Sequence, residues 1–271
     1  ILILNAILGQ ALISNYNSSE FQKTINVSIG QPVIYPDEKW NPNLRERNES
    51  IMNELLQKSL KSNPDVIVWL EAALTSFLAI SESRKRIEYQ EKIEASTLIT
   101  GIPQRVFLNN NLKVYNSAIF LRPDGFYDTY QKIFLVPFAE YVPFFKNWLS
   151  KMNQFDDMGS FTPGESYNTF DIGDIRSSIL ICYDSSSYKI AKKMVDNGAE
   201  IIFVITNDSY VGQSMPYQHF EHAKLRSIEL GIPFVQSANN GISGVILPSG
   251  EVLIKSDIDE RNIYNQSIKL K

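Results

Sequence analysis

The strongest indication of the fold is the run Asp65-Val-Ile-Val-Trp-Leu70, which is followed at once by Glu71. A continuous apolar run of this length is typical of a strand that is buried on both faces, as strands of parallel sheets are. Residues 43–61 before it predict an amphipathic helix, and the charged residues 81–94 after it predict another. A buried strand between helices favours an α/β fold.

The same alternation of strands and helices continues along most of the chain. Further strands are predicted at 24–30, 97–101, 114–121, 126–131, 176–183, 200–206, 234–238, 242–247 and 252–255, and further helices at 187–196 and 215–230. The sequence Arg122-Pro-Asp-Gly125 predicts a turn that joins two of these strands into a hairpin. No internal repeat, low-complexity tract or linker interrupts the pattern, so a single α/β domain is the simplest interpretation.

Composition excludes several classes of protein. The 271 residues include 26 Lys and Arg against 30 Asp and Glu, a net charge of −4, which argues against a nucleic-acid-binding protein. A single cysteine excludes an internal disulfide framework and a Cys-rich zinc site, and two histidines argue against an all-His metal site. A hydrophobic content of 44% is enough for a substantial core and excludes a disordered chain.

The first residues form a nearly apolar run, from Ile1 to Ile13, after which the chain turns polar at Ser14. This run is shorter than the roughly 20 apolar residues that span a bilayer as a helix. It also lacks the basic segment that begins a secretory signal. Two interpretations stay open: residues 1–15 are a buried first helix, or they are the end of a membrane helix.

Three reactive side chains stand at the ends of predicted strands or just after them: Glu71, Lys132 and Cys182. Ligands bind where the carboxyl ends of strands in an α/β sheet open a crevice. A lone cysteine on an apolar strand is usually inert packing, but a charge at the end of a buried strand is costly unless it is paired or functional. A carboxylate can take the thiol proton, and an ammonium can stabilise both the thiolate and an oxyanion. Acyl transfer through a thioester needs these three roles and no metal.

Longer motifs surround these residues. Tyr130-Gln-Lys-Ile-Phe-Leu-Val-Pro-Phe-Ala-Glu-Tyr-Val-Pro143 resembles the lysine segment of the nitrilase superfamily, in the form characteristic of apolipoprotein N-acyltransferases. Trp69-Leu-Glu-Ala-Ala-Leu74 resembles the glutamate segment of that family, and Ile181-Cys-Tyr-Asp184 resembles its cysteine segment. Shorter matches continue in the expected order at 31–32, 39–40, 206–212, 218–219, 226–229 and 239–243. The resemblance therefore extends from about residue 24 to residue 255.

The resemblance implies a four-layer α-β-β-α sandwich formed by residues 16–271. It assigns Glu71 as the base, Lys132 as the catalytic lysine and Cys182 as the nucleophile, with Glu140 orienting Lys132 or assisting proton transfer. It implies no cofactor and no metal. Side chains that we expect to contact the substrate are Trp40, Tyr183, Asp184, Tyr210, Phe145 and Trp148.

The reaction implied by the resemblance has two steps. An acyl chain passes from a phospholipid to the cysteine, and then to the N-terminal amine of a diacylglyceryl-cysteine lipoprotein. Members of the family carry this domain on the periplasmic side of the bacterial inner membrane, so the resemblance favours the membrane-helix interpretation of residues 1–15 and a membrane surface as a partner. Two alternatives stay open: a soluble amidase that acts on small amides, and a non-catalytic module that binds lipid or lipoprotein.

Several positions depart from the usual family pattern. Leu70 stands where proline is usual, Ala139 where glycine is usual, and Asp184 where glutamate is usual. Tyr210-Val211 stands where Trp-Phe is common. The segment 143–152 places Phe145 and Trp148 on one face of a predicted helix, which either packs on the core or touches a bilayer or an acyl chain.

Overall fold

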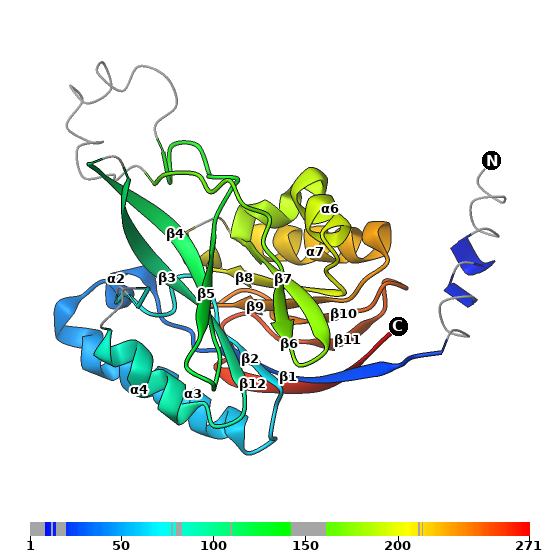
Figure 1. Cartoon of the computed structure of the whole chain (residues 1–271), viewed down its shortest axis with the longest axis horizontal. Coiled ribbons are helices and arrows are strands. Elements are labelled where there is room, and N and C mark those ends of the chain that lie inside the picture. The colour runs from blue at the N-terminus through cyan, green and yellow to red at the C-terminus, as the bar shows by residue number, and fades with distance from the viewer. Residues whose placement is uncertain are drawn as a thin grey trace.

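Two β-sheets packed face to face, with helices on both outer faces, give the molecule four layers (Figure 1). The computed structural model describes residues 9–11, 13–14, 20–76, 78–79, 83–108, 110–141, 161–210, 212 and 214–271. Helices α3 and α4 cover the first sheet, and α6 and α7 cover the second (Figure 1). The prediction of a four-layer α-β-β-α fold is confirmed.

The first sheet contains the strands β1 (Lys23–Gln31), β2 (Val66–Val68), β3 (Thr97–Leu108), β4 (Asn111–Leu121), β5 (Tyr127–Gln131) and β12 (Asn262–Leu270). The second contains β6 (Phe170–Ile172), β7 (Ile175–Ile181), β8 (Ile201–Thr206), β9 (Phe234–Ala238), β10 (Gly244–Ile246) and β11 (Val252–Lys255). The helices are α2 (Pro36–Lys39), α3 (Arg45–Leu60), α4 (Arg84–Lys92), α6 (Tyr188–Asp196) and α7 (Met215–Leu230), with short 3₁₀ turns η1 (Pro42–Leu44), η2 (Cys182–Ser186) and η3 (Asp208–Tyr210).

The strand order is β12-β1-β2-β3-β4-β5 in one sheet and β11-β10-β9-β8-β7-β6 in the other, over the described residues. In each sheet three neighbouring strands run parallel, β1-β2-β3 in the first and β7-β8-β9 in the second. Because parallel strands end at the same edge of a sheet, the residues that follow β7 and β8 are close to one another. The packing of the two sheets brings the end of β2 beside them, where the Asn207 amide bonds Glu71.

Strand β2 is buried on both faces, as the apolar run that contains it predicts. Val66 and Val68 pack in the core between the two sheets, together with residues of the second sheet. Ile67 and Trp69 point the other way, into the core under α3 and α4. The alternation has the two-residue period of a strand, and it explains why no position from Val66 to Leu70 is polar.

The structure differs from the sequence-based prediction in four strands. β3 continues to Leu108 rather than ending at Gly101, and β4 begins at Asn111 rather than at Val114, so the two form a longer hairpin. The strands β6 and β12 were not predicted. β12 is rich in polar residues, and it forms by pairing with β1 over nine positions, a contact between the two ends of the chain that no local pattern reveals.

Within the segment 1–15, residues 9–11 and 13–14 are described, and they are helical. No helix among the described residues is long enough and apolar enough to cross a bilayer. The interpretation of residues 1–15 as the end of a membrane helix stays a prediction.

Candidate active site

Glu71 lies at the carboxyl end of β2, on an extension of that strand. The ladder to β3 continues past Val68, since the Trp69 amide donates to the Ile99 carbonyl at 2.8 Å and the Gly101 amide donates to the Leu70 carbonyl at 3.0 Å. A Cβ atom on Gly101 would lie 2.6 Å from the Glu71 Cα, so only glycine allows β3 to pass this close. Glu71 is thereby held firmly against the sheet.

Lys132 directly follows β5, and its amide continues the ladder by donating to the Asn116 carbonyl of β4 at 2.9 Å. Its side chain is almost completely buried, with 1% of its surface exposed. Glu140 lies in the turn that follows, where its amide donates to the Val136 carbonyl at 2.9 Å. The antiparallel end of the first sheet therefore supplies both residues to the site.

Cys182 comes from the second sheet, at the turn where β7 ends and η2 begins. Its backbone has a φ of 49°, in the left-handed region that non-glycine residues rarely adopt. The Ser185 hydroxyl donates to the Cys182 carbonyl at 2.8 Å and closes this turn. Strain of this kind is found at functional sites, where the surrounding contacts hold it in place.

The three predicted catalytic residues line one cavity of about 340 Å³, together with Glu140 and Trp40. The other residues that line it are Ala72, Ile102, Pro103, Asn116, Val136, Ala139, Phe161 and Asn207. Apart from the polar and charged groups at Glu71, Asn116, Lys132, Glu140, Cys182 and Asn207, this wall is apolar or aromatic. The cavity thus combines a few polar groups with an apolar lining, which is the usual character of a site for a small molecule or an acyl chain.

A buried network joins the charged side chains. The Lys132 ammonium lies 3.3 Å from Oε1 of Glu71 and 2.9 Å from the Glu140 carboxylate. The Asn116 amide nitrogen donates to Oε1 of both carboxylates, at 2.7 Å to Glu71 and 2.8 Å to Glu140. One ammonium and one amide therefore hold two carboxylates that would otherwise repel each other.

The outer carboxylate oxygens bind backbone amides. Oε2 of Glu71 accepts from the Asn207 amide at 3.0 Å, and Oε2 of Glu140 accepts from the Val136 amide at 2.8 Å. Behind the site, the buried Lys39 ammonium donates to the Glu71 carbonyl at 3.0 Å. With every carboxylate oxygen bonded, the buried charges are paired and fixed in position.

The buried charges change the pKa values of both Cys182 and Lys132. Burial raises the pKa of the Cys182 thiol, the Glu71 carboxylate raises it further, and Lys132 only partly opposes this. Burial disfavours the charged form of Lys132, but Glu71, Cys182 and Glu140 outweigh that effect and raise the pKa of the ammonium. The resting thiol is therefore protonated at neutral pH, and the lysine stays charged. An ammonium that stays charged cannot accept the thiol proton, whereas the neighbouring carboxylates can.

Comparison with known proteins agrees with this geometry. The family model described as carbon-nitrogen hydrolase matches residues 31–271. The chain belongs to the carbon-nitrogen hydrolase family. It is 30% identical over 249 residues to an apolipoprotein N-acyltransferase of Geobacter metallireducens, covering 90% of this chain and 48% of that protein. It is 30% identical over 286 residues to an apolipoprotein N-acyltransferase of Rickettsia bellii, covering 100% of this chain and 56% of that protein. The chain thus spans about half the length of the curated relatives it matches.

Two solved structures from the nitrilase superfamily have the same fold as this chain. Saccharomyces cerevisiae Nit3, a member of the nitrilase superfamily, matches with a TM-score of 0.71 and 16% identity, over 93% of this chain and 92% of that chain. An amidase of Nesterenkonia AN1 from the same superfamily matches with a TM-score of 0.64 and 16% identity, over 93% of both chains. At this level of identity the likeness concerns the fold alone.

Asp184, which we expected to contact the substrate, lies in the core and does not line the cavity of this carbon-nitrogen hydrolase. Its carboxylate accepts hydrogen bonds from the Tyr130 hydroxyl at 2.8 Å, the Phe134 amide at 2.7 Å and the Ile181 amide at 3.2 Å. Burial raises the pKa of Asp184 to about 6, although these bonds oppose the shift. The shorter side chain at this position therefore ties the Cys182 turn to the segment after Lys132.

The other predicted substrate contacts are placed as follows. Trp40, about half exposed, lines the cavity, whereas the Tyr183 ring packs against Phe134 with centroids 4.9 Å apart and does not line the cavity. Tyr210 ends η3, and its side chain lies outside the described part of the structure, as do Phe145 and Trp148 entirely. Those three assignments stay predictions.

Three residues of the site were given no role in the sequence analysis. Asn116 lies on the face of β4 that carries the core residues Ala118 and Phe120. A polar amide on this otherwise apolar face is the feature of the sequence that could have identified it. Asn207 acts through its backbone amide, so its side chain carries no signal for this contact. Lys39 was recognised only as part of the Lys39-Trp40 motif, and its contact with Glu71 depends on the fold.

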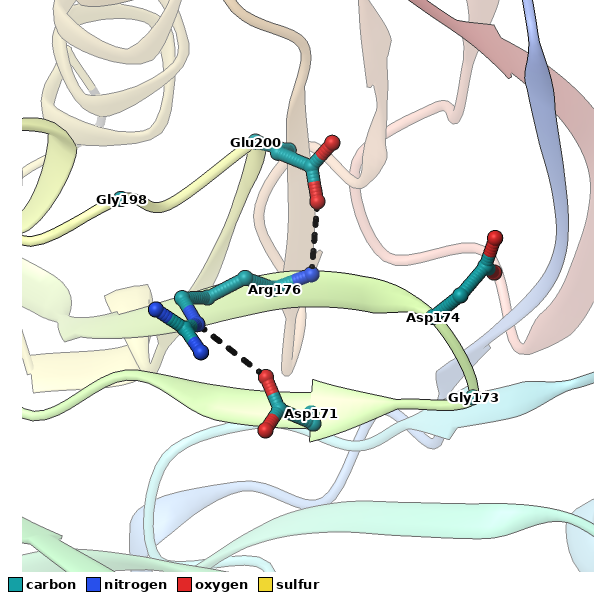
Figure 2. A pocket seen from close by; sticks show the side chains of 6 residues that line it. All are labelled: Asp171, Gly173, Asp174, Arg176, Gly198 and Glu200. Carbon is teal, nitrogen blue, oxygen red and sulfur yellow. Dashed lines mark hydrogen bonds and ion pairs between the residues drawn. The ribbon is translucent and has the colours of Figure 1, made fainter.

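Another cavity, of about 350 Å³, lies where β7 and β8 begin, and Figure 2 shows the residues that line it. Arg176 lies between two carboxylates: its Nε donates to Asp171 at 3.2 Å and its backbone amide donates to Glu200 at 2.9 Å (Figure 2). This cavity offers neither a nucleophile nor an apolar wall, so the candidate active site is the cavity at Cys182. Among the described residues, no group of three or more His, Cys, Asp or Glu side chains is arranged to hold a metal ion.

Proposed function

We propose that this chain is the catalytic domain of an apolipoprotein N-acyltransferase, which carries a fatty acyl chain on Cys182 between two lipid substrates. The donor is a phospholipid, and the acceptor is the N-terminal amine of a diacylglyceryl-cysteine lipoprotein. The observation that carries the proposal is the meeting of Glu71, Lys132 and Cys182 in one cavity whose remaining wall is largely apolar. The names of the relatives, together with the motif around Lys132 and Glu140, support this choice of substrates within the family.

In the first step Glu71 takes the proton from the Cys182 thiol, and Sγ attacks the ester carbonyl carbon of the phospholipid. The carbonyl oxygen becomes an oxyanion, which the Lys132 ammonium stabilises because that ammonium stays charged. The carbon–oxygen ester bond then breaks, Glu71 returns its proton to the departing alcohol, and the acyl chain remains as a thioester.

In the second step the amine of the acceptor attacks the thioester carbonyl, and the same ammonium stabilises the second oxyanion. Glu71 accepts the proton lost by the amine and passes it to the departing Cys182 sulfur. An amide has formed and the thiol is restored. Glu140 bonds Lys132 and Asn116, so we assign it the positioning of Lys132.

We place the domain at the periplasmic face of a bacterial inner membrane, since both substrates are lipids held in a bilayer. Residues 1–15 fit this location as the end of a membrane helix. The apolar lining at Ile102, Pro103, Val136 and Phe161 supports an acyl chain in the cavity better than a small polar amide.

The test is a transfer assay with the full chain, phospholipid vesicles and a synthetic diacylglyceryl-cysteine peptide, followed by mass spectrometry of the peptide. We expect an N-acylated peptide with the wild-type chain and none with Cys182→Ala. Release of ammonia from a small aliphatic amide, without peptide acylation, would identify a soluble amidase instead. Lipid binding without either reaction would identify a non-catalytic module.

A further inference from the structure

The hairpin of β3 and β4 ends in an exposed apolar tip. Phe107 has 77% of its surface exposed, Leu112 has 49% and Leu108 has 43%. In Figure 1 this hairpin extends away from the helices α6 and α7 of the second sheet. Exposed apolar side chains that cluster at one projecting point mark an interaction site more often than isolated ones do.

The tip is continuous with the catalytic cavity along one face of the hairpin. The register pairs Pro103 with Asn116, Arg105 with Val114, and Phe107 with Leu112. Alternate pairs share a face, and Pro103 and Asn116 line the cavity. The tip therefore lies about 13 Å from the cavity wall along this face, at roughly 3.3 Å for each residue of strand.

The charge around the tip differs from that of the whole molecule. The chain has a net charge of −4, yet residues 97–121, which include both strands of the hairpin, contain Arg105 and Lys113 and no Asp or Glu. Arg105 and Lys113 flank the apolar tip on the two strands. An apolar cluster flanked by cations fits the boundary of a phospholipid bilayer, where apolar groups enter the acyl region and cations meet phosphate.

The two strands of the hairpin stay paired up to the tip. Phe107 pairs with Leu112 and Leu108 pairs with Asn111, so these apolar side chains are held beside one another. Three large apolar side chains also cover far less than the roughly 800 Å² that each partner buries in a stable protein complex. The tip is large enough to enter a bilayer surface and too small to hold a protein alone.

We propose that Phe107, Leu108 and Leu112, with Arg105 and Lys113 beside them, dock this domain on a phospholipid bilayer and direct a donor lipid toward Cys182. This inference rests on the proposed function for the fate of the lipid. The docking itself stands on the exposure, register and charge of the hairpin.

The experiment measures sedimentation of the full chain with vesicles of zwitterionic phospholipid, with and without anionic phospholipid. The variant Phe107→Ser with Leu112→Ser should lose at least about tenfold in vesicle binding, since two buried apolar side chains are removed from the lipid. The matched control is Phe126→Ser. Phe126 is 68% exposed, and it lies in the turn between β4 and β5, at the end of β4 opposite to the tip. This control should change binding by less than about twofold.

A second variant isolates the charge. Arg105→Gln with Lys113→Gln should weaken binding to anionic vesicles and leave binding to zwitterionic vesicles unchanged, and added salt should remove the difference. Wild-type binding by the serine variant, or an equal loss in Phe126→Ser, would overturn the proposal. Unfolding curves of all variants should match the wild type, because none of the changed side chains is buried.

The two proposals fail in different ways. If the tip docks the domain, the serine variant acylates Cys182 normally from a water-dispersed short-chain phospholipid and poorly from vesicles. A chain that binds vesicles through the tip but never acylates Cys182 from either donor would retain the docking surface and contradict the proposed function.

Discussion

The two ends of strands β7 and β8 carry similar chemical groups and use them differently. Where the strands begin, Arg176 pairs with Asp171, and more than half of each side chain is exposed. Where the strands end, Cys182 and Asn207 meet Glu71 and the buried Lys132. The two ends differ in how far water reaches their charged groups. An exposed ion pair is hydrated whether or not it forms, whereas a buried one fixes geometry and shifts pKa values.

Burial at the catalytic end has a cost, and the hydrogen bonds offset it. Lys132 has two carboxylates, and Asn116 bridges the same two. Removing one member leaves a charge without its partner in a place that water does not reach easily. We therefore expect changes at the catalytic end to have large effects, and matched changes at the opposite end to have small ones.

The largest difference is expected for the nucleophile. Cys182→Ala should abolish acyl transfer, a loss of at least about a thousandfold, because no other group can carry the acyl chain. Its free energy of unfolding should stay close to wild type, since one small side chain replaces another. The assay is turnover with the diacylglyceryl-cysteine peptide, and Arg176→Ala should retain full turnover. Turnover by Cys182→Ala would refute a thioester mechanism.

The next largest effect on the rate is expected for Glu71, the proposed base. Glu71→Gln keeps an oxygen for the Asn207 amide but cannot take the thiol proton, so acylation of Cys182 should slow by about 10²–10⁴-fold. Because the pKa of the thiol is raised, the residual rate should climb about tenfold for each pH unit as thiolate appears. The measurement is the single-turnover acylation rate between pH 6 and pH 9. A residual rate independent of pH would assign proton removal to another group.

The ammonium is expected to affect stability as well as rate. Lys132→Met leaves Glu71 and Glu140 facing each other in a buried site, which should lower the free energy of unfolding by about 3–5 kcal/mol. The matched change Arg176→Met should lower it by less than about 1 kcal/mol, because that ion pair is exposed. Denaturant unfolding of both variants measures the contrast.

A double variant checks the cause of that loss. Lys132→Met combined with Glu140→Gln removes one of the two repelling charges and should recover part of the lost stability. Equal losses in the Lys132 and Arg176 variants would contradict the difference between the two ends.

The smallest effect concerns the buried Lys39. Burial lowers the pKa of Lys39 to about 7 although Glu71 opposes the shift, whereas the ordinary value is 10.5. Above pH 7 the unfolded chain therefore holds a proton that the folded chain releases, and the free energy of unfolding rises with pH up to about 10.5. Relative to Lys39→Met, the wild type should gain about 1 kcal/mol between pH 7 and pH 8. Denaturant unfolding at both pH values tests this, and a constant difference would show that Lys39 does not titrate there.

Local sequence was enough to predict most strands and helices and an α/β fold, and it singled out Glu71, Lys132 and Cys182; the four-layer arrangement was implied by the family resemblance. Apolar runs such as the one before Glu71 and the one before Cys182 are strands because they are buried on both faces. The polar strand β12 could not be predicted, since it owes its form to pairing with β1 at the other end of the chain. The outer half of β3 was also missed, because its side chains are exposed and follow no apolar alternation.

The partners of the reactive residues were harder to predict than the residues themselves. Asn116 lies 45 positions from Glu71 and meets it only because β3 and β4 fold back beside β2. Asn207 contributes a backbone amide, which every non-proline residue has. Asp184 looked like a substrate contact because it follows the nucleophile, but the turn at Cys182 directs its carboxylate into the core.

In the mechanism that we propose, the sulfur of Cys182 carries the acyl chain. The direct measurement is the mass of the peptide that contains Cys182, taken after the full chain is incubated with phospholipid and no acceptor. We expect one acyl group on Cys182, which disappears when a diacylglyceryl-cysteine peptide is added. An unmodified Cys182, or an acyl group that persists on the Cys182→Ala chain, would contradict it.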